Sequence, residues 1–198
     1  MRFQSSQVID FPVQRVFELL RDNLQGLVPF MPNVQKIEVE SRGQTEGGQI
    51  RIVNRWVGKA EIPKITTAFI KPEMIGWVDT AVWDEMDMTC RWQIEPGFFR
   101  NHVVCRGVNC YRSEADGKKT RLEITGDLSV QSKGLPGVPR LLEKKVAEQI
   151  EKFVVRLLTP NLDQLARGVS QYLKRGISSQ QSVFRPNRPD PKAESLGK

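Results

Sequence analysis

The chain has 198 residues, of which 39% are hydrophobic and 27% charged, a composition typical of a globular domain with a buried core. No segment approaches the roughly 20 consecutive apolar residues that a transmembrane helix needs, and the N-terminus lacks the apolar region of a secretory signal. The three cysteines are too few, and odd in number, for a disulfide framework. We therefore expect a cytoplasmic protein.

The formal net charge of +7 is typical of proteins that contact nucleic acid or an anionic membrane surface. Much of this excess lies in the last third of the chain, and no run of five Lys or Arg residues occurs. Because no basic stripe carries interleaved aromatic residues, we expect no specific nucleic-acid binding. A peripheral contact with an anionic membrane remains an alternative.

The N-terminal region predicts one strand and two short helices, followed by a series of strands. We expect a strand over residues 3–10, an amphipathic helix ending near Asp22, and an apolar segment, 24–31, of one or two turns. From residue 36 the hydrophobic period becomes two, and turn residues separate the apolar runs. The strands expected here cover residues 36–42, 49–57, 64–71, 76–84, 88–95, 102–113 and 119–130. Their short connections favour an antiparallel meander.

The C-terminal third returns to the helical period of 3.6. Its longest apolar stripe predicts a long helix and consists of Leu142, Val146, Ile150, Phe153 and Leu157. Pro160 then either kinks this helix or begins a second one, with Thr159 as its cap. We divide the chain into a domain of residues 1–158, an amphipathic helical extension, 159–175, and a disordered basic tail, 176–198.

The extension has an apolar stripe of its own, which consists of Leu162, Leu165, Val169, Tyr172 and Leu173. An apolar helical stripe usually faces a core. The alternative is an interfacial anchor, in which the stripe and the basic tail contact anionic lipid.

Two segments resemble a known superfamily. Residues 6–22, SQVIDFPVQRVFELLRD, are similar to the opening strand and first helix of START-like (SRPBCC) proteins, which include the birch-pollen-allergen fold and polyketide cyclase/dehydrase relatives. Residues 70–77, IKPEMIGW, resemble the family's turn and following aromatic strand. The resemblance covers about residues 3–158. It implies an α+β helix-grip fold, in which a curved antiparallel sheet of six to eight strands surrounds one long C-terminal helix, with two short helices after the first strand.

The resemblance also implies a cavity between the sheet and the long helix, with its mouth near the second short helix and neighbouring hairpin loops. Such pockets are mostly apolar with few polar groups. We expect Val146, Ile150, Phe153 and Leu157 to line it from the helix, because they form one apolar stripe.

Two strand faces are the candidates for the opposite wall. Ile52, Asn54 and Trp56 share one face of strand 49–57, whose other face carries two arginines. Trp77, Asp79 and Trp83 share a face of strand 76–84, where two rings flanking a carboxylate could orient a flat ligand with one polar end. The alternatives are a plain aromatic core with Asp79 outward, and hydrogen bonds from Asn54 or Asp79 to the backbone.

Metal and cofactor chemistry find little support. A zinc site of His102, Cys105, Cys110 and Cys90 is disfavoured, because a separation of five residues puts Cys105 and Cys110 on opposite faces of a strand. His102 is the only histidine, which limits nucleophilic triads. No GxGxxG, P-loop or HExxH motif occurs, so we expect no cofactor. Acid–base chemistry by Asp79, Asp84 or Glu95 is conceivable.

Three functions therefore compete. The first is a carrier or sensor that binds an apolar molecule such as a lipid, quinone or pigment, and needs only an apolar lining and a mouth. The second is a cyclase- or dehydratase-like enzyme, which needs an inward titratable group with a shifted pKa. The third is a membrane- or protein-interaction module, which would have a filled core and an exposed apolar patch.

Overall fold

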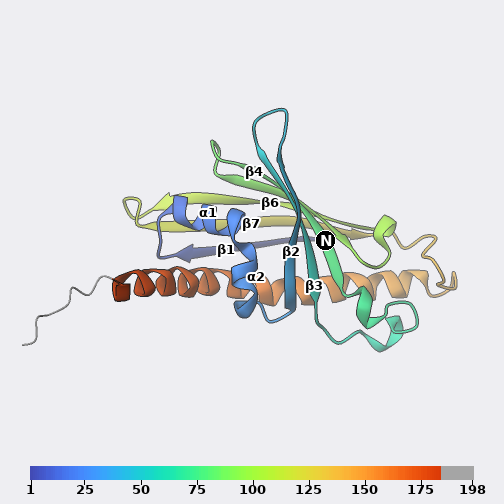
Figure 1. Ribbon diagram of the computed structural model, residues 1–198. Coiled ribbons are helices and arrows are strands. Elements are labelled where there is room, and N and C mark those ends of the chain that lie inside the picture. The colour runs from blue at the N-terminus through green and yellow to red at the C-terminus, as the bar shows by residue number, and fades with distance from the viewer. Residues whose placement is uncertain (184–198) are drawn as a thin grey trace, which may run out of the picture.

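Seven antiparallel strands form one sheet with the order β1-β7-β6-β5-β4-β3-β2 in the computed structural model (Figure 1). The structure describes residues 1–183, without the side chains of Ile65, Asp163 and 177–183. The strands are β1 (Arg2–Ile9), β2 (Val34–Gln44), β3 (Ile50–Gly58), β4 (Gly76–Asp84), β5 (Thr89–Pro96), β6 (Val103–Glu114) and β7 (Lys119–Val130). Consecutive strands from β2 to β7 pair as neighbours, and β1 pairs with β7.

Two helical segments separate β1 from β2, and one long helix follows β7. They are α1 (Val13–Asp22), the 3₁₀ helix η1 (Leu24–Phe30) and α2 (Glu143–Val183). Helix α2, orange to red in Figure 1, runs along one face of the sheet. Short 3₁₀ turns lie in the connections and are η2 (Lys64–Thr66), η3 (Pro72–Met74) and η4 (Arg100–His102). The predicted helix-grip fold with two short helices after the first strand is confirmed.

The strand predicted over residues 64–71 is wrong, because this segment satisfies its own backbone locally. The Thr66 hydroxyl donates to the Pro63 carbonyl at 2.8 Å, and the Ile70 N–H donates to the Thr66 carbonyl at 2.8 Å. Such local hydrogen bonds compete with pairing to a neighbouring strand. The segment instead links β3 to β4, and its buried Ile70 packs in a cluster with residues of α2.

Helix α2 continues through Pro160, so residues 159–175 extend the same helix and do not begin a new one. The helix also continues through the first residues of the predicted tail to Val183, and residues 184–198 lie outside the described part of the chain. Among the described residues, no helix has the length and hydropathy needed to cross a membrane.

The apolar stripe of 159–175 faces the core. Val169 and Leu173 are buried, and Leu162, Leu165 and Tyr172 pack against the same cluster. Gly168 allows this close packing, because a Cβ atom there would lie 2.7 Å from the Cβ of Phe30 in η1. The stripe is therefore covered by η1 and the sheet, which leaves it unavailable as a membrane anchor in this conformation.

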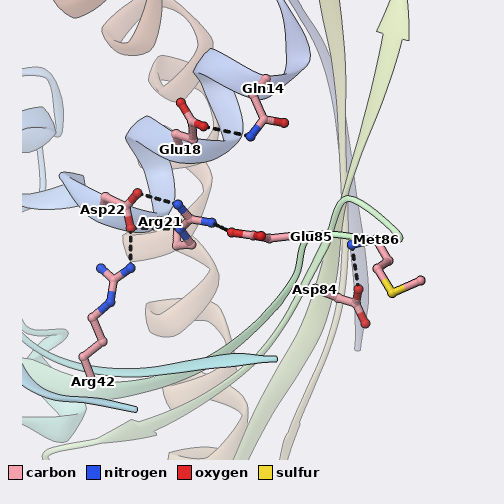
Figure 2. A network of polar contacts seen from close by, with 8 residues as sticks. All are labelled: Gln14, Glu18, Arg21, Asp22, Arg42, Asp84, Glu85 and Met86. Atoms are coloured by element: carbon pink, nitrogen blue, oxygen red, sulfur yellow. Dashed lines mark hydrogen bonds and ion pairs between the residues drawn. The ribbon is translucent and has the colours of Figure 1, made fainter. Parts of the chain in front are cut away.

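A network of charged side chains ties the end of α1 to the sheet (Figure 2). Arg21 pairs with Asp22 and with Glu85 in the β4–β5 turn, and Asp22 also accepts a bond from Arg42 of β2 at 2.7 Å. Hydrogen bonds from Arg21 and Arg42 lower the pKa of Asp22. The partners Asp22, Arg42 and Glu85 are substantially exposed, so each pair contributes about 1 kcal/mol or less, although the Arg21 side chain itself is largely covered.

Candidate functional site

A cavity of about 150 Å³ lies between the sheet and the middle of α2. An apolar cavity of roughly this volume in another protein accommodates benzene. All four tryptophans of the chain line it, and the other lining residues are Phe3, Leu20, Leu24, Met31, Asp79, Ala81, Cys90, Ile94, Asn109, Tyr111, Ile124, Leu158, Asn161, Leu162 and Leu165. The cavity is thus apolar and aromatic, with a few polar side chains.

Aromatic pairs set by the strand register form two parts of the wall. Trp56 of β3 lies directly opposite Trp77 of β4, and their rings stack with centroids 5.2 Å apart. Elsewhere Phe17 of α1 makes edge-to-face contacts with both Trp83 and Tyr111, each at 5.2 Å. These contacts fix the orientation of the rings, so the aromatic surface is formed before any ligand binds.

Among the described residues, Asp79 supplies the one carboxyl group of the cavity lining. Its cross-strand neighbour is the buried Asn54, whose side-chain amide donates to the Asp79 carboxylate at 3.4 Å. Burial raises the pKa of Asp79 to about 7, and the bonds from Asn54 and the Trp56 indole offset part of that rise. The accessible part of Asp79 borders the cavity, so a ligand there meets a carboxyl group that is protonated or ionised in comparable amounts at neutral pH.

Two buried polar atoms beside the cavity are incompletely bonded. The Trp56 indole N–H and the Tyr111 hydroxyl have no partner of full hydrogen-bond geometry among the described residues. By contrast, the Trp92 indole N–H donates to the Asn109 amide oxygen at 2.9 Å. Buried donors without a partner are uncommon in native proteins and cost free energy. A polar atom of a bound ligand could supply the missing hydrogen bonds after a small rearrangement of these side chains.

The strand residues predicted for the site are only partly at the cavity surface. Trp56, Trp77, Asp79 and Trp83 line it. Asn54 is not among the lining residues, and its side-chain amide donates to the Asp79 carboxylate. Ile52 is buried in the neighbouring core and does not line the cavity.

The four helix residues predicted to line the cavity lie outside it, and this expectation is corrected. Val146, Ile150, Phe153 and Leu157 are buried in a second cluster together with Ile70, Ile75, Phe98, Val103, Cys105, Leu128, Leu135 and Val138. The N-terminal half of α2 therefore packs against side chains of the sheet and its connecting segments. The cavity lining begins at the next residue of the same helix, Leu158, and continues to Leu165.

The sequence analysis missed several lining residues. Asn161, Leu162 and Leu165 fall in the predicted extension and Leu158 ends the predicted domain, although their spacing continues one helical stripe past Pro160. In the sheet, Trp92 was overlooked even though it alternates with Cys90 and Ile94 on one face of β5. Strand parity predicted the shared face, but nothing in the pattern indicated that it faces inward.

The other acid–base candidates and His102 lie away from the cavity lining, whereas Cys90 of the candidate zinc set is part of it. Asp84 accepts a hydrogen bond from the Gln49 side chain at 2.7 Å, and the Glu95 carboxylate lies 3.8 Å from the Arg100 guanidinium. Both carboxylates therefore interact with polar side chains outside the cavity. His102 ends η4. Among the described residues, no group of three or more His, Cys, Asp and Glu side chains is placed to hold a metal ion.

A curved sheet that grips a long helix over an apolar cavity defines the helix-grip class of ligand-binding domains. The chain belongs to the family described as polyketide cyclase / dehydrase and lipid transport, whose profile matches residues 1–169. A search of curated proteins found no match.

Solved structures share the fold at low sequence identity. The aromatase/cyclase ZhuI from Streptomyces sp. R1128 is 17% identical, with a TM-score of 0.62 over 89% of this chain and 95% of that chain. TTHA0849 from Thermus thermophilus is 21% identical, with a TM-score of 0.57 over 89% and 99%. Norcoclaurine synthase from Thalictrum flavum is 12% identical, with a TM-score of 0.55 over 88% and 86%. At these identities the similarity establishes the fold alone.

Proposed function

We propose that this protein binds a small apolar molecule, about one aromatic ring in width and with one polar end, in the cavity beneath Trp56, Trp77 and Trp83. The observation that carries the proposal is an apolar volume of about 150 Å³ that borders one carboxyl group, that of Asp79, among the side chains the structure describes. A lipid, quinone or pigment would fit only with its ring or one end of its chain inside. The family, with its description of lipid transport and cyclase chemistry, supports a ligand of this class.

The polar end of the ligand is expected to lie at Asp79. A protonated carboxyl group both donates and accepts hydrogen bonds, so it can pair with a hydroxyl or a carbonyl group. Because burial raises its pKa to about 7, Asp79 is protonated in much of the protein at neutral pH. An uncharged polar group can bond to either form of Asp79, whereas an anion would be repelled by the ionised form, so an uncharged group is favoured.

Partly filling the cavity should weaken binding. Ala81 is buried on the cavity wall, and an Ala81→Met side chain can extend into the empty volume. We expect 4-fluorobenzyl alcohol, which has one ring and one hydroxyl, to bind the wild-type protein and to bind Ala81→Met about tenfold more weakly. ¹⁹F NMR titration measures this, and the change in tryptophan emission provides an independent reading because all four tryptophans line the cavity.

Val104→Met is the matched control, because Val104 lies exposed on β6 and adds no volume to the cavity. It should bind the probe as the wild-type protein does. Equal affinity for Ala81→Met and the wild-type protein would show that the probe binds elsewhere, and the proposal would fail.

A cyclase- or dehydratase-like activity in the same cavity is the second candidate, and the position of Asp79 favours it. A general acid or base works best with a pKa near the working pH, and the pKa of Asp79 is about 7. If Asp79 transfers a proton, Asp79→Asn should keep probe affinity within about threefold yet lower turnover of an aromatic hydroxy-ketone substrate by about 100-fold or more. Turnover that survives the substitution would remove Asp79 as the acid or base.

A further inference from the structure

A second hollow lies directly behind one wall of the cavity, between β1 and α2. It has a volume of about 90 Å³ and is lined by Phe3, Gln4, Ser5, Val155, Leu158, Thr159 and Leu162. Phe3, Leu158 and Leu162 border both this groove and the cavity. The partition between the two spaces is therefore formed by these three side chains.

The helix that carries the partition has an interrupted backbone at this point. Pro160 has no N–H, so the Arg156 carbonyl lacks its helical donor. The Asn33 side-chain amide lies 3.5 Å from that carbonyl and donates to the Leu157 carbonyl at 3.2 Å. Asn161 also donates to the Leu157 carbonyl, at 3.0 Å. Side-chain amides thus replace part of the backbone bonding beside Leu158.

Gln7 of β1 holds the next turn of the helix. Its side-chain N–H donates to the Leu162 carbonyl at 2.5 Å, and its side-chain oxygen accepts from the Ala166 N–H at 3.0 Å. In a regular α-helix these two backbone groups are the acceptor and donor of one hydrogen bond. The Gln7 side chain therefore holds this turn of α2 against β1. The same turn places Leu162 and Leu165 on the cavity wall.

We propose that ligands pass between the cavity and the β1–α2 groove through the partition of Phe3, Leu158 and Leu162, and that Gln7 is the latch of this passage. The inference rests on the proposed function, and the ligand is the same apolar molecule of one ring width. Release of Gln7 frees the turn after Pro160 to move away from β1. The free-energy cost of releasing Gln7 is low, because its two hydrogen bonds to α2 are replaced by hydrogen bonds to water.

The test measures exchange rates and equilibrium affinity separately. Gln7→Leu keeps the approximate size of the side chain and removes both bonds to α2. We expect association and dissociation of 4-fluorobenzyl alcohol, followed by ¹⁹F exchange NMR, to accelerate about tenfold with less than about a twofold change in Kd. Gln14→Leu is the matched control, since Gln14 bonds only Glu18 on the exposed face of α1 among the described residues (Figure 2), and it should exchange at the wild-type rate.

A second variant blocks the groove without touching the cavity lining. Thr159 is exposed and lines only the groove, so Thr159→Trp should slow both rates by about fivefold or more while Kd stays unchanged. Wild-type rates in both Gln7→Leu and Thr159→Trp would overturn the passage and leave the side of the cavity at Leu24 and Met31 as the route. If the probe fails to bind the wild-type protein, or binds Ala81→Met equally well, the cavity proposal itself is lost.

Discussion

Asp79→Asn should make the protein more stable than the wild type at pH 8, by up to about 4 kcal/mol in the free energy of unfolding, and close to equal at pH 4. The pKa of Asp79 is about 7 in the folded protein, above its ordinary value of 3.8. The folded protein therefore binds this proton more tightly than the unfolded chain does. Between about pH 4 and pH 7 the contribution of Asp79 to stability must fall as the pH rises, and above pH 7 it levels off.

The amide of Asp79→Asn has the shape of the protonated carboxyl group, never ionises, and still offers an oxygen to Asn54. Urea titrations at pH 4 and pH 8, followed by tryptophan fluorescence, give the two free energies. Asp127→Asn, on an exposed position of β7, is the control and should change stability by less than about 0.5 kcal/mol at both pH values. The same small change for Asp79→Asn at pH 8 would mean that the Asp79 carboxyl group is hydrated in the folded protein. The conclusion that burial raises its pKa would then be wrong.

Phe153→Ala should cost about 3–5 kcal/mol in the free energy of unfolding. Phe153 is 1% exposed, its ring centroid lies 6.0 Å from that of Phe98, and it does not line the cavity. The ring lies in a cluster of buried side chains that includes Ile150 and Leu157, so its removal leaves a cavity among them. Removing the ring therefore loses both its transfer free energy and its dispersion contacts.

Leu165→Ala provides the comparison, because Leu165 is half-buried on the same helix but faces the existing cavity. Fewer of its contacts are lost on truncation, so the expected cost is smaller than that of Phe153→Ala. Chemical denaturation of both variants tests the division of α2 into a packed half and a cavity half. A larger cost at Leu165 than at Phe153 would reverse that division.

The amino-acid sequence by itself determined the elements and most of the faces. Alternation placed Trp77, Asp79 and Trp83 on one face of β4, and all three line the cavity. The period of 3.6 identified the helix and its buried stripe, because burying one face of a helix requires apolar residues at that spacing. The strand predicted over residues 64–71 does not form, although its composition is typical of a strand. Short-range hydrogen bonds to the Pro63 and Thr66 carbonyls satisfy the backbone there instead.

Only the tertiary structure decided which turns of α2 face the cavity and which pack directly against side chains of the sheet. A hydrophobic period assigns a residue to a face, but it carries no information on how far along the helix the sheet remains in contact. The register likewise joined Asn54 to Asp79 and Trp56 to Trp77, since partners across strands depend on pairing between segments distant in sequence. From the sequence, Pro160 indicates a helix boundary, because it lacks the N–H that a continuous helix needs. Asn33, which compensates for this loss, lies more than 100 residues away in the sequence and meets the helix only in the folded protein.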